Sequence, residues 1–95
     1  MTVQDPGLDD FAGRIGRPFL VEAAGLRADL VLDAAEELPG SPRSRGGFRL
    51  EFVGPSDPIL GQGVFPLAID DDRFEIFLVP LGPDASGRRY EAVFF

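Results

Sequence analysis

The chain has 95 residues, which suits one domain and excludes a large multidomain enzyme. Nine basic and 16 acidic residues give a formal net charge of −7, which disfavours binding to nucleic acids and to anionic membrane surfaces. With 44% hydrophobic residues and no Cys, the chain is expected to fold around an apolar core without disulfides or a thiolate metal site.

The N-terminal part predicts a flexible segment followed by a short helix. The flexible segment is residues 1–7. Residues 1–6 lack the basic and apolar regions of a secretory signal, and the longest apolar stretch, residues 76–81, is far too short for a membrane span. We therefore expect a cytoplasmic protein. Over residues 8–16 a short helix is predicted, with Leu8, Phe11 and Ile15 on one face. So short a helix needs packing to persist, and we expect it to cover one end of a sheet.

Six strands are predicted next, at residues 17–24, 27–36, 48–53, 64–69, 73–79 and 90–95, because apolar and polar side chains alternate there. The segment 27–38 is ambiguous. Its alternation favours a strand, whereas Ala34–Leu38 is rich in helix formers and would suit a helix.

Turns and loops separate these strands. Ala24-Gly25 and Asp70–Asp72 read as tight turns, residues 39–47 as a flexible exposed loop, and residues 54–63 and 82–87 as irregular connections. Short strands with hairpin-length connections predict one mainly β domain over residues 1–95, either a small antiparallel barrel or a sandwich.

The residue types exclude most catalytic chemistry. Without His, Cys or Lys there is no imidazole base, thiolate nucleophile or Schiff base. Carboxylate pairs remain at residues 9–10, 36–37 and 70–72, but they lie in turns or near element ends, where carboxyl pKa values stay ordinary. We therefore predict no catalytic residues and no enzyme.

Neither a metal nor a cofactor is expected. Asp70–Asp72 lacks the alternating ligands and the turn glycine of a calcium loop. Gly61-Gln62-Gly63 lacks the Lys and the following helix of a phosphate loop. We expect instead that this stretch needs positive φ angles and that the Gln62 side chain caps loop amides.

Two surfaces are candidates for binding. The second faces of the last two strands carry Phe77, Val79, Val93 and Phe95, and the Arg88-Arg89 pair could hold an acidic segment. If the helix or the first strand covers these apolar residues they belong to the core; if not, they form a partner surface, and the edge of the last strand could pair with another chain. The alternative is a site for a small molecule or glycan in the loops 39–47 and 54–63 at one end of a barrel, using Arg43, Arg45 and Gln62.

Several segments also resemble, in order, a family of small bacterial domains of unknown function. They are residues 11–16, 48–52 with Gly54-Pro55, Gln62-Gly63, 76–80 with Gly82-Pro83, and 90–94; Val64-Phe65 departs from the family's usual Thr-Tyr type pair. The resemblance implies no activity. It suggests a genomic neighbourhood with phage-tail-collar-type proteins, and hence a role beside a fibre or phage-tail-like assembly. The leading hypothesis is therefore a non-enzymatic interaction or assembly domain whose partner is another protein or a second copy.

Overall fold

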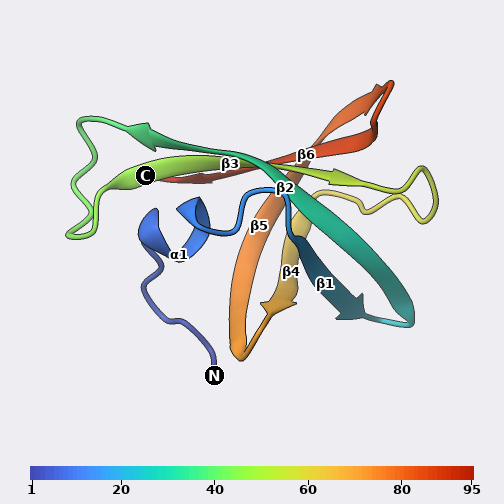
Figure 1. Ribbon diagram of the computed structural model, residues 1–95, viewed down its shortest axis with the longest axis horizontal. Coiled ribbons are helices and arrows are strands. Elements are labelled where there is room, and N and C mark those ends of the chain that lie inside the picture. The colour runs from blue at the N-terminus through green and yellow to red at the C-terminus, as the bar shows by residue number, and fades with distance from the viewer.

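The computed structural model describes residues 1–95, and its six strands close into one ring in the order β1-β2-β3-β6-β5-β4 (Figure 1). All neighbouring strands are antiparallel. The predicted class, mainly β with one short helix, is confirmed, and the single closed sheet excludes a sandwich of two sheets. The elements are α1 (Asp9–Ala12), β1 (Pro18–Ala23), β2 (Leu26–Leu38), β3 (Gly47–Gly54), β4 (Gly63–Ile69), β5 (Asp72–Asp84) and β6 (Gly87–Phe94).

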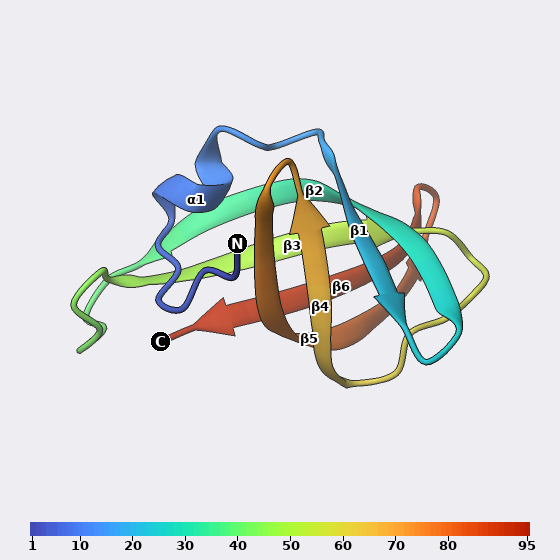
Figure 2. The same ribbon diagram turned by 90° about the horizontal axis from the view of Figure 1, so that it is seen from below.

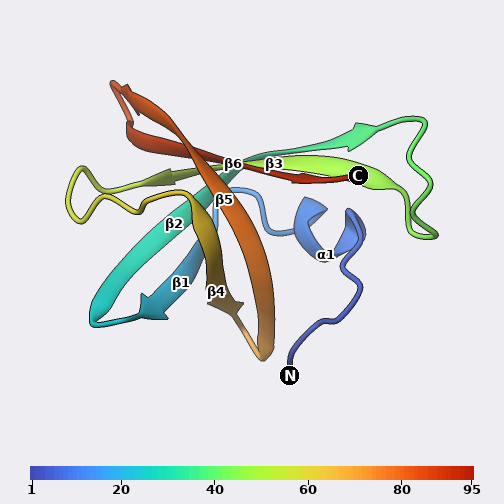
Figure 3. The same ribbon diagram turned by 180° about the vertical axis from the view of Figure 1, so that it is seen from behind.

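The two long strands, β2 and β5, each pair with two neighbours in succession. β2 pairs with β1 through residues 26–31 and with β3 through residues 31–38, with a register shift between Leu32 and Ala34. β5 pairs with β4 through residues 72–78 and with β6 from Val79 onward. Figures 1 and 3 show both strands bending as they pass from one half of the ring to the other. These bends allow a sheet of only six strands to close.

The ambiguous segment 27–38 is a strand throughout. Its helix-forming end, Ala34–Leu38, lies opposite residues 47–51 of β3. Pairing with β3 therefore overrides the intrinsic helix preference of these residues. At the other end of β2, Ala24 and Gly25 have φ angles of 51° and 80°, the two positive values that a tight two-residue hairpin turn requires.

The core fills the interior of the ring, and a different plug closes each end. Phe11 of α1 is fully buried, with its ring centroid 4.7 Å from that of Phe74 and 5.6 Å from that of Phe48. Figure 2 shows α1 across this end, in agreement with the expectation that the short helix covers one end of the sheet. At the other end Leu60 is buried, and its backbone N–H donates a 3.0 Å hydrogen bond to the Tyr90 hydroxyl. The interior is therefore filled by apolar side chains from α1, the strands and the loop after β3.

Three local predictions are wrong. Ile15 is exposed, because α1 ends at Ala12 and the spacing that would align Ile15 with Phe11 no longer applies. Residues 82–87 are not a loop: β5 continues to Asp84 and β6 begins at Gly87, and a register shift between Pro80 and Gly82 accommodates the Gly and Pro residues. Gly61 and Gly63 do not have positive φ angles, and Gln62 makes no hydrogen bond in its exposed loop.

The single helix, α1, is neither long nor apolar enough to cross a membrane.

Candidate interaction surface

Strand β4 has no polar side chain on either face. Leu67 and Ile69 point into the core, whereas Val64, Pro66 and Ala68 alternate with them and point outward. The side chain of Val64 is 61% exposed. An outward face made only of apolar residues distinguishes β4 from β3, whose outward positions include Arg49 and Glu51.

The neighbouring strands extend this outward face. Val64 lies directly opposite Phe77 of β5, which is 49% exposed, and Ala68 lies opposite Leu20 of β1. Val79 follows Phe77 on the same side of β5. Figure 1 shows β1, β4 and β5 side by side, with α1 on another side of the molecule. We name these residues the outer apolar patch: Leu20, Val64, Pro66, Ala68, Phe77 and Val79.

The structure brings together only part of the surface predicted from the sequence. Phe77 and Val79 belong to the outer apolar patch, and Val93 and Phe95 are also exposed, at 54% and 57%. However, pairing between β5 and β6 ends at Val79 and Glu91. Beyond that point β5 continues to its hairpin with β4 while β6 continues along β3 (Figure 3). Val93 and Phe95 are therefore separated from Phe77 and Val79, because β5 and β6 diverge beyond Glu91. Neither the helix nor the first strand covers Phe77, Val93 or Phe95, since all three remain exposed, whereas Val79 is partly buried.

Arg89 is committed to ion pairs within the chain. Its guanidinium lies 2.8 Å from Asp33 and 3.2 Å from Glu51, and it also donates to Asp84. The hydrogen bond from Arg89, together with one from the Ser86 backbone, lowers the pKa of Asp84. Arg88, by contrast, makes no ion pair. Of the predicted basic pair, only Arg88 remains available to an acidic segment.

The predicted loop site does not form as a single site. Arg43 and Arg45 lie in the loop before β3, and Gln62 lies in the loop after it, so one strand separates them by its whole length. Arg43 stacks 5.5 Å from the Phe48 ring centroid and donates to Asp5 at 3.1 Å. Arg45 donates to Asp9 at 2.5 Å. Both arginines therefore hold the N-terminal segment and the start of α1 against this loop.

The acidic turn Asp70-Asp71 joins β4 to β5 as a hairpin, as the sequence indicated. Arg17 donates two hydrogen bonds to Asp70, at 2.7 and 3.0 Å, and Arg14 pairs with Asp72 at 2.7 Å. The hydrogen bond from Arg17 lowers the pKa of Asp70. No group of three acidic side chains converges as a metal site would require. These acids fasten the hairpin to the segment between α1 and β1.

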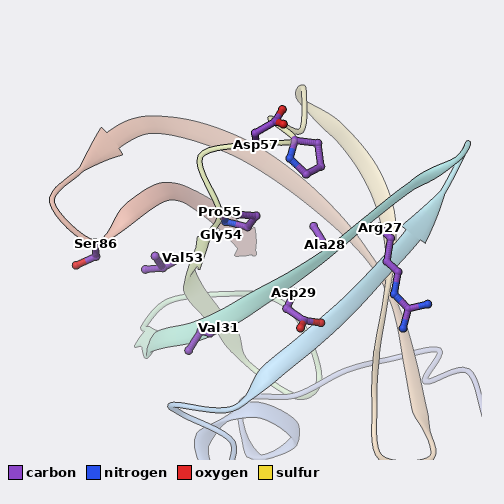
Figure 4. A pocket seen from close by; sticks show the side chains of 10 residues that line it. Arg27, Ala28, Asp29, Val31, Val53, Gly54, Pro55, Asp57 and Ser86 are labelled. Atoms are coloured by element: carbon purple, nitrogen blue, oxygen red, sulfur yellow. The ribbon is translucent and has the colours of Figure 1, made fainter.

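The carboxyl groups of Asp70 and Asp84 have lowered pKa values, whereas a general acid needs a raised one. One open depression of about 490 Å³ lies between β2, the end of β3 and the following loop. Its two acids, Asp29 and Asp57, are exposed, and Figure 4 shows them well apart on different segments. The depression therefore offers no paired carboxylates.

Of the outer apolar patch, the sequence analysis predicted Phe77 and Val79 but missed the residues of β4 and β1. The available signal was the run of residues 63–69, in which no side chain is polar. Assigning Phe65, Leu67 and Ile69 to the core accounted for only one face of that strand.

Comparisons with known proteins give one match. Neither the curated proteins nor the solved structures include a match to the chain. One family, described as a domain of unknown function (DUF6916), matches residues 6–94, which include all six strands and α1. The chain therefore belongs to the DUF6916 family.

Proposed function

We propose that this protein is a non-enzymatic interaction or assembly domain that binds another protein through the outer apolar patch. The observation that carries the proposal is the all-apolar outward face of β4, continued by Phe77 on β5. Monomeric proteins rarely leave large contiguous apolar patches in water, and such patches mark sites where partners bind. Burying Val64 and Phe77 alone would contribute about 1–3 kcal/mol each, a usual share for the centre of an interface.

The charge around the patch supports a partner of a particular kind. Glu75 lies opposite Pro66, points outward, and makes no ion pair. Arg73, opposite Ala68, is likewise exposed, and its side chain makes no ion pair. An apolar centre with free charges beside it matches the usual arrangement of interfaces, in which apolar contacts supply affinity and polar groups fix the orientation.

The family resemblance adds a class of partner to test. Proteins of a fibre or phage-tail-like assembly are the first candidates, since the resemblance implies genes of that kind nearby. The absence of His, Cys and Lys, and the downward pKa shifts of Asp70 and Asp84, support a role in binding over a role in catalysis.

The test is quantitative affinity capture from an extract of the native host with three forms of the chain. The double variant V64S/F77S removes the centre of the patch, and Ile15→Ser is its control, because Ile15 is 50% exposed and lies outside the patch. We expect a reproducible partner with the parent chain and with Ile15→Ser. With V64S/F77S, recovery should fall at least about tenfold, the effect of losing roughly 1.4 kcal/mol of binding energy.

The proposal is contradicted if the double variant captures as much partner as the parent, or if the control loses it equally. Circular dichroism and thermal unfolding of all three forms separate loss of binding from loss of fold. Both substituted positions point away from the core, so the fold is expected to persist.

A further inference from the structure

One side of β5 is largely unpaired over its first half. β4 occupies the other side over residues 72–78, and β6 joins the second side only from Val79 onward. Before Val79, the second side has one partner, the isolated parallel bridge between Thr2 and Arg73. This unpaired edge borders Phe77 of the outer apolar patch.

The chain's own N-terminal residues show that this edge accepts an extended segment. The Val3 N–H donates to the Arg73 carbonyl at 2.8 Å, and the Arg73 N–H donates to the Met1 carbonyl at 2.8 Å. Backbone groups alternate sides along a strand, so Glu75 and Phe77 direct their N–H and C=O groups to the same side as Arg73. Outside the strand ladders, neither residue makes a backbone hydrogen bond. The N-terminal segment thus pairs with Arg73 only, and the backbone groups of Glu75 and Phe77 on this side have no partner.

The space beneath this edge is filled. Phe11 packs 4.7 Å from Phe74 of β5 and 6.3 Å from Phe94 of β6, measured between ring centroids. Since these rings already occupy the interior, a segment added at the edge would pair with the backbone of β5 over an apolar floor without entering the core.

We infer that the edge of β5 at residues 73–77 is a strand-addition site for an extended segment of a partner protein, and that residues 1–3 partly occupy this site in the free chain. The inference rests on the proposed function, since it assigns a binding mode to the same surface. Residues 1–3, which partly occupy the edge, lie outside the family match, whereas the edge itself lies within the matched residues 6–94. In strand addition, backbone hydrogen bonds supply affinity and alternate side chains supply specificity.

The edge favours a partner segment that is positively charged as well as extended. Glu75 is exposed and unpaired in the middle of the edge, so a Lys or Arg on the added segment would find a complementary carboxylate. Apolar residues two positions before and after that cation lie on the same outward face and would extend the outer apolar patch beside Phe77. A second copy of this chain is disfavoured, because two molecules of net charge −7 repel each other. The partner segment is therefore extended, apolar and basic.

The test uses a soluble seven-residue peptide of alternating Val and Thr with a central Lys, titrated into the isotopically labelled full chain. Two control peptides accompany it: one is N-methylated on the two residues that flank Lys and so cannot pair with a strand, and the other carries Glu in place of Lys. The Val3→Pro variant removes the N–H that donates to Arg73 and weakens the occupant. Gln4→Pro is its control, because the Gln4 N–H makes no hydrogen bond.

We expect amide chemical-shift changes and slower hydrogen exchange centred on Glu75 and Phe77. The dissociation constant should be about fivefold lower for Val3→Pro than for Gln4→Pro, which corresponds to the loss of one competing hydrogen bond. The Glu peptide should bind more weakly, and the N-methylated peptide should not bind.

Equal binding of the N-methylated peptide, or no change at Glu75 and Phe77 at millimolar peptide, would overturn the inference. The three peptides can be compared on the parent chain alone, so the result does not depend on the folding of Val3→Pro. If affinity capture depends on Val64 and Phe77 while the peptide fails, the outer apolar patch remains an interaction surface and only the strand-addition mode is wrong. If the peptide pairs but V64S/F77S captures normally, the proposed function is wrong.

Discussion

At the scale of single residues, the buried hydrogen bond between Leu60 and Tyr90 explains how a Pro- and Gly-rich connection can close one end of the ring. The loop after β3 contains Pro55, Pro58 and Gly61, and its only buried side chain is Leu60. A buried N–H without a partner is costly, and the Tyr90 hydroxyl supplies that partner from the adjacent core. The phenol thus fixes the position of the plug.

Replacing this hydroxyl should destabilise the fold measurably. Tyr90→Phe keeps the ring but leaves the Leu60 N–H unpaired, so we expect the free energy of unfolding to fall by about 1–3 kcal/mol. Urea unfolding measures the change. Ser56→Ala is a control in the same exposed loop and should shift stability by less than about 0.5 kcal/mol. Equal stability of Tyr90→Phe and the parent would mean that the hydrogen bond does not hold the loop.

At the scale of the elements, alternation of apolar and polar residues was enough to predict the six strands, because inward positions such as Leu50 and Ile76 are fully buried. Two features depended on pairing that a single sequence does not display. Ala34–Leu38 became a strand through its ladder with β3, and residues 82–84 extended β5 because a register shift absorbs Pro80 and Gly82. The extent of the apolar surface around the outward face of β4 also could not be predicted without the strand pairing. Its neighbours Phe77 and Leu20 are far away in sequence and became adjacent only through register.

The hairpin between β4 and β5 should confer a dependence of stability on pH. Arg17 lowers the pKa of Asp70 below its ordinary value of 3.8. A lowered carboxyl pKa contributes stability that is fully present above pH 3.8 and is lost as the pH falls through the folded-state pKa. The contribution is modest, since the pair is exposed.

Arg17→Gln should therefore move the pKa of Asp70 back towards 3.8 and flatten the acid limb of the stability curve. Carboxyl-carbon NMR titration measures the pKa directly, and urea unfolding between neutral pH and acid measures the limb. Arg27→Gln, which removes a pair with Glu22 instead, should leave Asp70 unchanged. An unchanged Asp70 titration in Arg17→Gln would show that the ion pair does not form in solution.

At the scale of the whole molecule, the two ends of the ring are closed by Phe11 and by Leu60, and seven of the nine arginines are engaged in ion pairs. The ends and the charged faces are thus occupied by the chain itself. The side formed by β1, β4 and the first half of β5 differs, because its outward residues are mostly apolar and one backbone edge is open. This contrast across the molecule is the basis for assigning binding to that side.

Hydrogen–deuterium exchange of the chain, alone and in complex with the partner recovered by affinity capture, tests this assignment most directly. The account predicts that protection on binding is greatest in residues 63–79, which comprise β4, the turn that follows it and β5 as far as Val79. The loop 39–47 and the depression near Asp29 should exchange alike in both states. Protection confined to that loop or to that depression, with β4 and β5 unchanged, would contradict the account.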